Sequence, residues 1–150
     1  MRRLFIVRKD LHMTTGKISA QLMHCAEAYW TRLIRENAVK TDLVDLNDMD
    51  SYDYECRFTI NKTVFEEYIN GRFTKTVCQA KNKNHLLKAK VMADEIGLIE
   101  NKDYGLIYDA CLTELEPEEP NGTTLTAVWF APLPEDISHR ISKKYHLYIG

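Results

Sequence analysis

Apolar and polar residues recur with two different periods along the chain, and the changes of period outline strands and helices. Leu4 to Val7 form a short apolar run closed by charged residues, which predicts a buried strand. From Lys17 to about Glu36 the apolar side chains recur at helical spacing and cover most of the circumference, so this helix should be largely buried. Its remaining polar stripe starts at the helix N-terminus and holds Lys17, Gln21, His24 and Ala28. We expect the chemistry of the protein on this stripe.

The rest of the chain continues the alternation of the two patterns. Three further strands are predicted, over Thr74 to Ala80, Gly105 to Leu112 and Leu125 to Phe130. Three further helices are predicted, one capped by Asn61 and stopped at Asn70-Gly71, one capped by Asn84 and ending at Gly97, and one from Pro134 to about Tyr145. Residues 41 to 57 contain six acids and break the pattern, so we interpret them as an acidic loop or insertion.

This order of elements predicts the fold class. Strands that alternate with helices indicate an α/β fold with a mainly parallel sheet and right-handed crossovers. The last two strands are joined by the Pro117 to Gly122 turn, and antiparallel pairing there would make the sheet mixed. A length of 150 residues fits one domain with one hydrophobic core.

Composition and charge narrow the class of protein. Hydrophobic residues make up 45 % of the chain, which excludes global disorder. The net charge of −2 excludes indiscriminate binding to nucleic acid. Basic blocks at 1 to 35, 59 to 92 and 137 to 150 nevertheless alternate with acidic blocks, so a local basic track remains possible.

The cysteines and the N-terminus bear on the cellular setting. Cys25, Cys56, Cys78 and Cys111 show no metal-ligand spacing and are interpreted as reduced thiols. The N-terminus lacks the apolar core of a signal peptide, and no stretch approaches the 18 apolar residues of a membrane span. A soluble protein of a reducing compartment, the cytoplasm, is expected, with no membrane partner.

Several common kinds of site are excluded by their motifs. The glycines form neither a dinucleotide-binding fingerprint nor a phosphate-binding P-loop, and no serine lies in a nucleophile elbow. The histidines include no zinc-binding pair at helical spacing. We therefore expect no dinucleotide or nucleoside triphosphate site and no zinc site.

Three features converge at one end of the predicted sheet, where ligands of open α/β sheets bind. Asp10 follows the first strand, Lys17 opens the long helix, and Asp109 lies late in the third strand with Thr113 after it. A lysine beside an aspartate lowers the pKa of the carboxyl, and such a pair can hold a water and offer positive charge to an oxyanion. This arrangement suits hydrolysis of an ester or of a substrate that bears phosphate.

The same residues resemble a known family. The string from Val7 to Ala26 resembles RxDLxMxxGKxxAQxxHA, the opening signature of the archaeal and eukaryotic type of peptidyl-tRNA hydrolase. Asp109 to Thr113 resembles its DAGxT segment, and Thr126 to Pro132 resembles its TVxxxGP strand. The end of the chain is similar to its closing helix and strand, so the resemblance covers roughly residues 4 to 36 and 74 to 148.

The resemblance implies a single domain over residues 1 to 150 in three layers, a four-stranded mixed sheet flanked by helices, with a divergent insertion at about 37 to 73. It implies a hydrolase, often a homodimer, that cleaves the ester between peptide and tRNA without metal or cofactor. Carried over by position, the catalytic residues are Lys17, Asp109 and Thr113, with Asp10, Gln21, His24 and Thr126 binding substrate or supporting the site. The basic residues that would contact the tRNA backbone are Arg8, Lys81, Lys83, Lys88 and Lys90.

The sequence departs from the family pattern at three places and leaves alternatives open. Cys111 and Ala131 replace glycines, and about five extra residues around Glu118 to Gly122 lengthen a turn. We hypothesise that Asp109 orients or deprotonates the attacking water with help from Thr113, while Lys17 serves the oxyanion or a tRNA phosphate. One alternative is a non-catalytic relative that binds RNA or protein, and another is an esterase of small acyl substrates.

Overall fold

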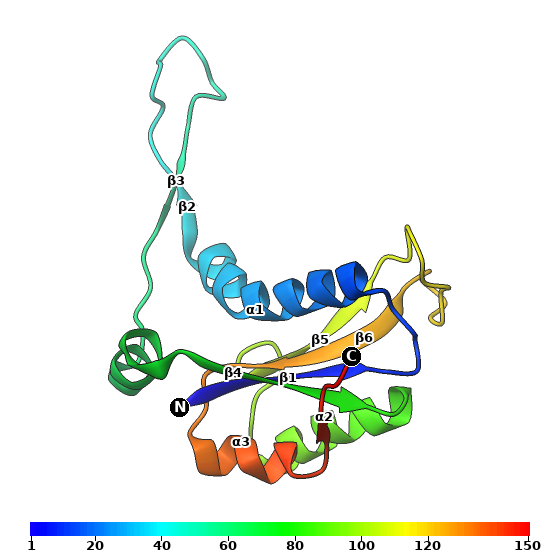
Figure 1. The fold of residues 1–150 in the computed structure, drawn as a ribbon. Coiled ribbons are helices and arrows are strands. Elements are labelled where there is room, and N and C mark those ends of the chain that lie inside the picture. The colour runs from blue at the N-terminus through cyan, green and yellow to red at the C-terminus, as the bar shows by residue number, and fades with distance from the viewer.

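Strand β1 (Arg2–Arg8) runs through the middle of a five-stranded mixed sheet with the order β5-β6-β1-β4-β7 (Figure 1). The computed structural model describes all 150 residues. The other strands are β4 (Thr74–Ala80), β5 (Tyr104–Asp109), β6 (Thr124–Phe130) and the short β7 (His146–Leu147). The fold is thus the expected α/β fold with a mixed sheet, and it has five strands rather than four, because the terminal segment pairs with β4.

The prediction of a mainly parallel sheet is wrong. Only β1 and β4 pair in parallel, whereas the β1–β6, β5–β6 and β4–β7 pairs are antiparallel. The reason lies in the connections, because parallel neighbours need a long crossover and β5 reaches β6 through a loop without a helix. The sequence left open an antiparallel pairing of these two strands, and the structure has it.

Helices cover both faces of the sheet and make three layers. Helix α1 (Thr15–Asn37) lies on one face, and α2 (Lys83–Ile96) and α3 (Glu135–Ser142) lie on the other (Figure 1). The apolar core is correspondingly divided into a cluster of 14 buried residues and a second cluster of 8. None of these helices combines the length and the apolar composition that crossing a membrane requires.

Two element ends differ from the prediction for local reasons. Helix α2 is capped by Asn82 rather than Asn84, because the Asn82 side chain accepts the His85 N–H at 2.9 Å. Its predicted end at Gly97 is confirmed, with a left-handed φ of 92°. Strand β5 stops at Asp109 rather than Leu112, because the chain turns at Cys111, whose φ is 56°.

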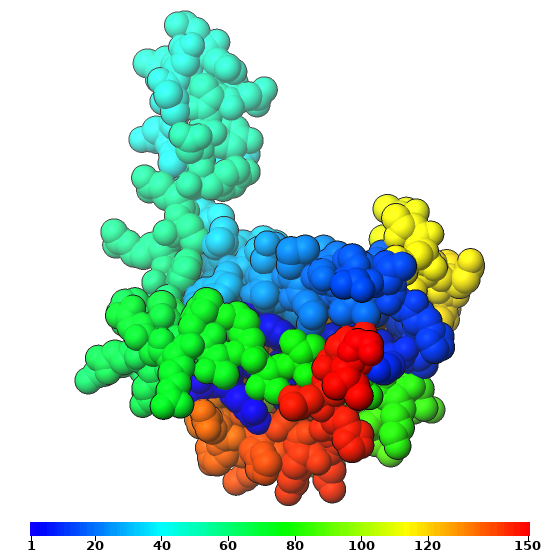
Figure 2. Space-filling view, in the orientation of Figure 1, coloured from blue at the N-terminus to red at the C-terminus, as the bar shows by residue number.

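The acidic segment is a hairpin that projects from the body, which we call the hairpin arm (residues 38 to 57; Figures 1 and 2). Strands β2 (Ala38–Lys40) and β3 (Tyr54–Cys56) pair antiparallel at its base. The prediction of a loop missed these strands, since three residues are too few to show a period. After the arm, the predicted short helix is present as a π-helix, η1 (Val64–Arg72), anchored by the fully buried Tyr68.

A buried arginine fixes the helix that carries the polar stripe. Arg3 of β1 is only 1 % exposed, and its guanidinium donates to the carbonyls of Cys25, Ala26 and Phe130. Because two of these acceptors belong to the middle of α1, the side chain ties the helix to the sheet. Burial raises the pKa of the Cys25 thiol to about 12, so this cysteine is a neutral packing residue.

Candidate functional site

The sheet brings three strand ends and one helix start to the same end of the molecule. β1 and β4 run in parallel, and β5 has the same direction because it is antiparallel to β6, which is antiparallel to β1. Asp109 is the last residue of β5, and α1 begins at Thr15 beside the loop that follows it (Figure 1). The predicted meeting of Lys17 with Asp109 is therefore produced by the topology.

Lys17 and Asp109 form the centre of the site. The Lys17 Nζ lies 2.7 Å from Asp109 Oδ2, and the two side chains are only 13 % and 10 % exposed. The same ammonium donates to Thr113 Oγ1 at 3.2 Å. The three residues predicted to be catalytic are thus joined through one nitrogen. We call Lys17, Asp109 and Thr113, together with the residues that hold them, the Lys17–Asp109 cluster.

Gln21 and Thr126 fix the Asp109 carboxylate through a chain of two hydrogen bonds. The Gln21 Nε2 donates to Asp109 Oδ2 at 2.9 Å, and the Thr126 hydroxyl donates to Gln21 Oε1 at 2.6 Å. Both residues are fully buried. Because the hydroxyl occupies the amide oxygen, the amide nitrogen must face Asp109, and this fixes the position of the carboxylate.

Cys111 supplies the last bond to the carboxylate. Its backbone N–H donates to Asp109 Oδ1 at 2.9 Å, so both oxygens of Asp109 are bound. The φ of 56° at Cys111 lies in the left-handed region, where glycine is favoured. This is the position at which the chain departs from the glycine of the DAGxT pattern, and the chain keeps the turn in spite of the added side chain.

The hydrogen bonds decide the charge state of Asp109. Burial raises the pKa of this carboxyl, but hydrogen bonds from Lys17, from the Cys111 N–H and from Gln21 lower it more, so the pKa lies below its ordinary value. Asp109 is therefore a carboxylate at neutral pH. An ionised carboxylate accepts hydrogen bonds or a proton from a water molecule.

One supporting pair was not predicted from the sequence. Thr14 caps α1 by accepting the Lys17 N–H, and Glu114 accepts hydrogen bonds from both the backbone N–H and the hydroxyl of Thr14, at 2.8 and 2.7 Å. The loop after β5 is thereby tied to the start of α1. The Thr14 cap was not identified from the sequence, and its partner Glu114 lies 100 residues away, where periodicity cannot reveal it.

Arg8 and Asp10 belong to a different contact. Arg8 is 3 % exposed and binds both carboxylate oxygens of Asp10 and of Glu118. No hydrogen bond or ion pair joins these residues to Lys17 or Asp109. The lengthened turn around Glu118 is therefore bound to the end of β1. The guanidinium of Arg8 already has carboxylate partners within the protein.

The four lysines of the predicted basic track differ in their partners. Lys83 forms an ion pair with Glu119, and Lys90 forms ion pairs with Asp94 and Glu100. Lys81 and Lys88 are exposed and have no ion pair. These two side chains line one polar hollow with His85, and Lys144 joins Lys88 and His85 in the adjoining hollow.

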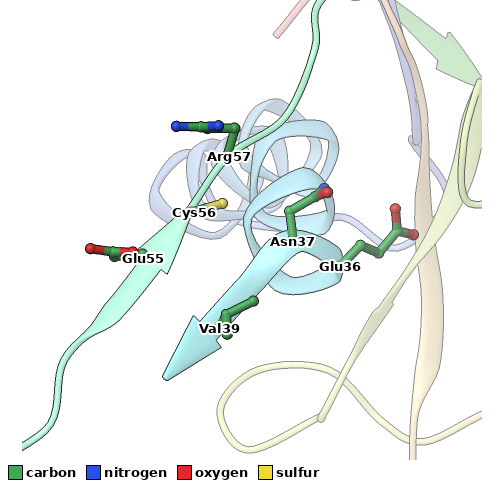
Figure 3. Close-up of a pocket in the computed structure, with 6 residues that line it drawn as sticks. All are labelled: Glu36, Asn37, Val39, Glu55, Cys56 and Arg57. Carbon is green, nitrogen blue, oxygen red and sulfur yellow. The ribbon is translucent and has the colours of Figure 1, made fainter. Parts of the chain in front are cut away.

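His24 lies outside the Lys17–Asp109 cluster. It is exposed on α1 and lines a groove of about 520 Å³ between α1 and β5. A larger hollow, about 780 Å³, lies at the base of the hairpin arm and is lined by residues such as Val39 and Cys56 (Figure 3). That hollow is open to solvent and contains none of the predicted site residues.

No group of three or more histidine, cysteine, aspartate or glutamate side chains is placed to hold a metal ion. The Lys17–Asp109 cluster offers one carboxylate, to which an ammonium and an amide are bound.

Comparison with known proteins shows which family the chain resembles along nearly its whole length. The sequence profile of the family described as "Peptidyl-tRNA hydrolase PTH2" matches residues 1–148. The chain is 26 % identical over 146 residues to the peptidyl-tRNA hydrolase of Thermoplasma acidophilum, with 97 % of each chain covered. It is 28 % identical over 142 residues to the peptidyl-tRNA hydrolase of Sulfolobus acidocaldarius, with 95 % of each chain covered.

Proposed function

The chain belongs to the peptidyl-tRNA hydrolase family PTH2, a family of hydrolases, and from this membership we propose how it cleaves peptidyl-tRNA. The substrate is the ester between the carboxyl group of a peptide and the terminal ribose of tRNA. The reaction takes place at the Lys17–Asp109 cluster. The observation that carries the proposal is the 2.7 Å contact between Lys17 Nζ and a carboxylate whose two oxygens are both fixed.

The chemical step uses one water molecule. The water, bound to Asp109, attacks the ester carbonyl carbon while its proton passes to the carboxylate, and a tetrahedral oxyanion forms. The carbon–oxygen bond to the ribose then breaks, and the proton passes from Asp109 to the ribose oxygen. The products are a peptide with a free carboxyl group and a tRNA with a free terminal hydroxyl. Thr113, which shares the Lys17 ammonium, helps to orient the water.

Of the two roles open to Lys17, the geometry favours the oxyanion. The ammonium lies within the cluster, where it is bound to the Asp109 carboxylate and the Thr113 hydroxyl, and its side chain is 13 % exposed. Lys17 is also held beside the carboxylate that binds the water, so its charge is close to the carbon under attack. A preorganised donor at this place stabilises the charge that develops in the transition state.

The tRNA would lie across the same end of the sheet. Three inter-strand spacings separate β5 from β4, about 14 Å, so the start of α2 lies within reach of a nucleotide chain whose end is at Asp109. Lys81 and Lys88 are free to meet phosphates there, with Lys144 beside them. Lys83 and Lys90 would have to break ion pairs first, and Arg8 is buried, so they are not retained as tRNA contacts.

Peptidyl-tRNA cleavage measured across salt concentrations tests the proposal against its alternatives. Two or three phosphate contacts predict a steep fall of kcat/KM with salt, and the double variant Lys81→Gln, Lys88→Gln should flatten that slope. An esterase of small acyl substrates would cleave a nitrophenyl ester with no salt slope. A non-catalytic relative would bind tRNA without releasing it from the peptide.

A homodimer in the cytoplasm completes the proposal. The sheet edge at β7 carries the exposed apolar Leu147, with Ile149 after it, and contact with a second copy would cover both. Light scattering should give twice the mass of one chain for the wild type. The double variant Leu147→Lys, Ile149→Lys should give the mass of one chain. A substrate made during translation and four unpaired cysteines fit the cytoplasm.

A further inference from the structure

A groove of about 520 Å³ opens next to the Lys17–Asp109 cluster and has no part in the cleavage step. Its two walls come from α1 and from strand β5. The lining residues are His24, Glu27, Ala28, Thr31 and Arg35 on the helix, with Leu106, Ile107 and Tyr108 on the strand. Polar and apolar side chains share the walls.

The groove is continuous with the cluster on both walls. At 100° per residue, the helix residues that line it fall within about 80° of Lys17 and Gln21, apart from Glu27 at the margin, so they continue the same stripe of α1. On the other wall Tyr108 directly precedes Asp109. A molecule whose reacting group lies at Asp109 therefore meets this groove as soon as it extends along β5.

Strand β5 is an edge strand. The sheet order places β6 on one side of it and no strand on the other, where an isolated bridge with Glu100 covers only the first residue, Tyr104. An edge strand presents backbone N–H and C=O groups that a further extended chain can use. Such pairing binds a peptide through its main chain, and side-chain identity matters little.

We propose that the peptide part of peptidyl-tRNA binds in this groove as an extended strand added to the free edge of β5. The residue that carries the ester lies at Asp109, and the preceding residues run toward Arg35. The peptide is then parallel to β5, since its C-terminus and that of β5 lie at the same end. This inference rests on the proposed function and adds to it the way in which peptides of differing sequence are held.

The dimensions set the number of residues. Leu106 to Asp109 span about 10 Å of strand, and Gln21 to Arg35 span about 21 Å of helix. At about 3.3 Å per residue, an extended peptide of three to six residues fills the groove. Residues beyond that length reach solvent and add nothing to binding.

A substrate series of increasing peptide length tests the inference. We expect kcat/KM to rise by at least about tenfold from an N-acetylated single residue to a tetrapeptide, and to level off beyond about six residues. Thr31→Trp, which fills the groove, should abolish the rise and spare the single-residue substrate. Ser19→Trp is the matched control, because both hydroxyls bond the carbonyl four residues earlier and Ser19 lies on the far side of α1.

Modified substrates test the main-chain contacts with the wild-type protein. N-methylation of the peptide at successive residues should lower kcat/KM at alternate positions only, because every second N–H faces β5. Equal rates for all lengths, or equal effects of methylation at neighbouring positions, would overturn the groove as the peptide site.

A non-cleavable probe separates this inference from the proposed function. We would titrate tetrapeptidyl-adenosine, linked by an amide in place of the ester, and follow the backbone amide signals by NMR. Shifts confined to residues 104 to 109 and to the α1 stripe, lost in Thr31→Trp, support the groove even if no substrate is cleaved. Shifts elsewhere, or none, reject it even if cleavage is fast. Absence of cleavage at every length rejects the proposed function alone.

Discussion

The Lys17–Asp109 cluster and the hairpin arm both contain carboxylates, but they hold them in opposite ways. At Asp109 an ammonium, an amide and a backbone N–H bind the two oxygens, and the side chain is 10 % exposed. In the arm, five aspartates and one glutamate between residues 42 and 55 are exposed, and those with partners accept only backbone N–H groups of the same loop, as Asp45 and Asp48 do. A carboxylate becomes a candidate for catalysis where its position and its charge are fixed by several independent elements.

The same contrast sets the energetic consequences of substitution. Removing one partner of a buried, hydrogen-bonded pair leaves a group without solvent or partner, which is costly. Removing an exposed acid from the arm leaves only water in its place. The effects of substitution should therefore fall steeply from the cluster to the arm.

Asp109→Asn should have the largest effect. The amide cannot accept the proton of the attacking water, so single-turnover cleavage of peptidyl-tRNA should fall roughly 10²- to 10⁴-fold. Asp53→Asn in the arm is the matched control and should cleave at the wild-type rate. A small loss in Asp109→Asn, comparable with the control, would remove Asp109 from the mechanism.

Lys17→Ala should have the next largest effect on the cleavage rate. Loss of one preorganised charge at the oxyanion costs about 10²- to 10³-fold in kcat, with little change in KM. The exposed Lys62→Ala provides the control for loss of a lysine. A rise in KM with kcat unchanged would instead assign Lys17 to substrate binding, such as a tRNA phosphate.

Gln21→Ala should change the pH dependence as well as the rate. Hydrogen bonds hold the pKa of Asp109 below its ordinary value, so activity should persist down through the usual range of an aspartate. Without the Gln21 amide the pKa rises, and the acid limb of kcat/KM moves to higher pH. The stability from the ionised carboxylate is present at neutral pH and is lost as pH falls through the folded pKa.

The matched amide control for this profile is Gln79→Ala. The Gln79 oxygen accepts an N–H from Ile149, far from Asp109, so this variant should keep the wild-type acid limb. An acid limb that stays in place in Gln21→Ala would show that the amide does not influence the Asp109 carboxylate.

Cys111→Gly should raise stability modestly. A side chain in the left-handed region costs about 1 to 2 kcal/mol, partly offset by the greater freedom of glycine in the unfolded chain. We expect a gain of about 1 kcal/mol in the free energy of unfolding by urea. Cys111→Ala keeps a Cβ at the same φ of 56° and should gain nothing. An equal gain in both variants would place the effect in the thiol rather than in the backbone.

The hairpin arm should have the smallest effect. Lys40 and Tyr54 are paired in the β2–β3 register, so residues 41 to 53 can be replaced by Asn-Gly, which closes a two-residue hairpin. Since the arm contributes no residue to the cluster, kcat/KM for peptidyl-tRNA should stay within about twofold of the wild type. A large loss would show that the arm takes part in substrate binding.

The sequence predicted the parts that depend on local pattern. The apolar runs of β1, β4 and β6 and the stripe of α1 were placed within two residues, because each is long enough to show its period. Lys17 and Asp109 were chosen as candidates because residue type and element ends coincide. Their joining at one end of the sheet was also expected.

The pattern of apolar and polar residues could not predict contacts between residues that are far apart in the sequence. The Thr14–Glu114 and Arg8–Glu118 contacts join residues 100 and 110 positions apart, and no periodicity links them. The sheet was expected to be mainly parallel because the alternation of elements does not specify where β6 inserts, and it inserts antiparallel beside β1. The two residues of β7 are too short for any period to appear.

Hydrolysis in water enriched in ¹⁸O, followed by mass spectrometry of both products, tests the central claim most directly. Water attack at the Lys17–Asp109 cluster predicts one ¹⁸O atom in the peptide carboxyl group and an intact tRNA without label at its terminal ribose. The wild type should give these products rapidly and Asp109→Asn only at a trace rate. A shortened tRNA, label in the ribose, or equal release by both proteins would contradict the account.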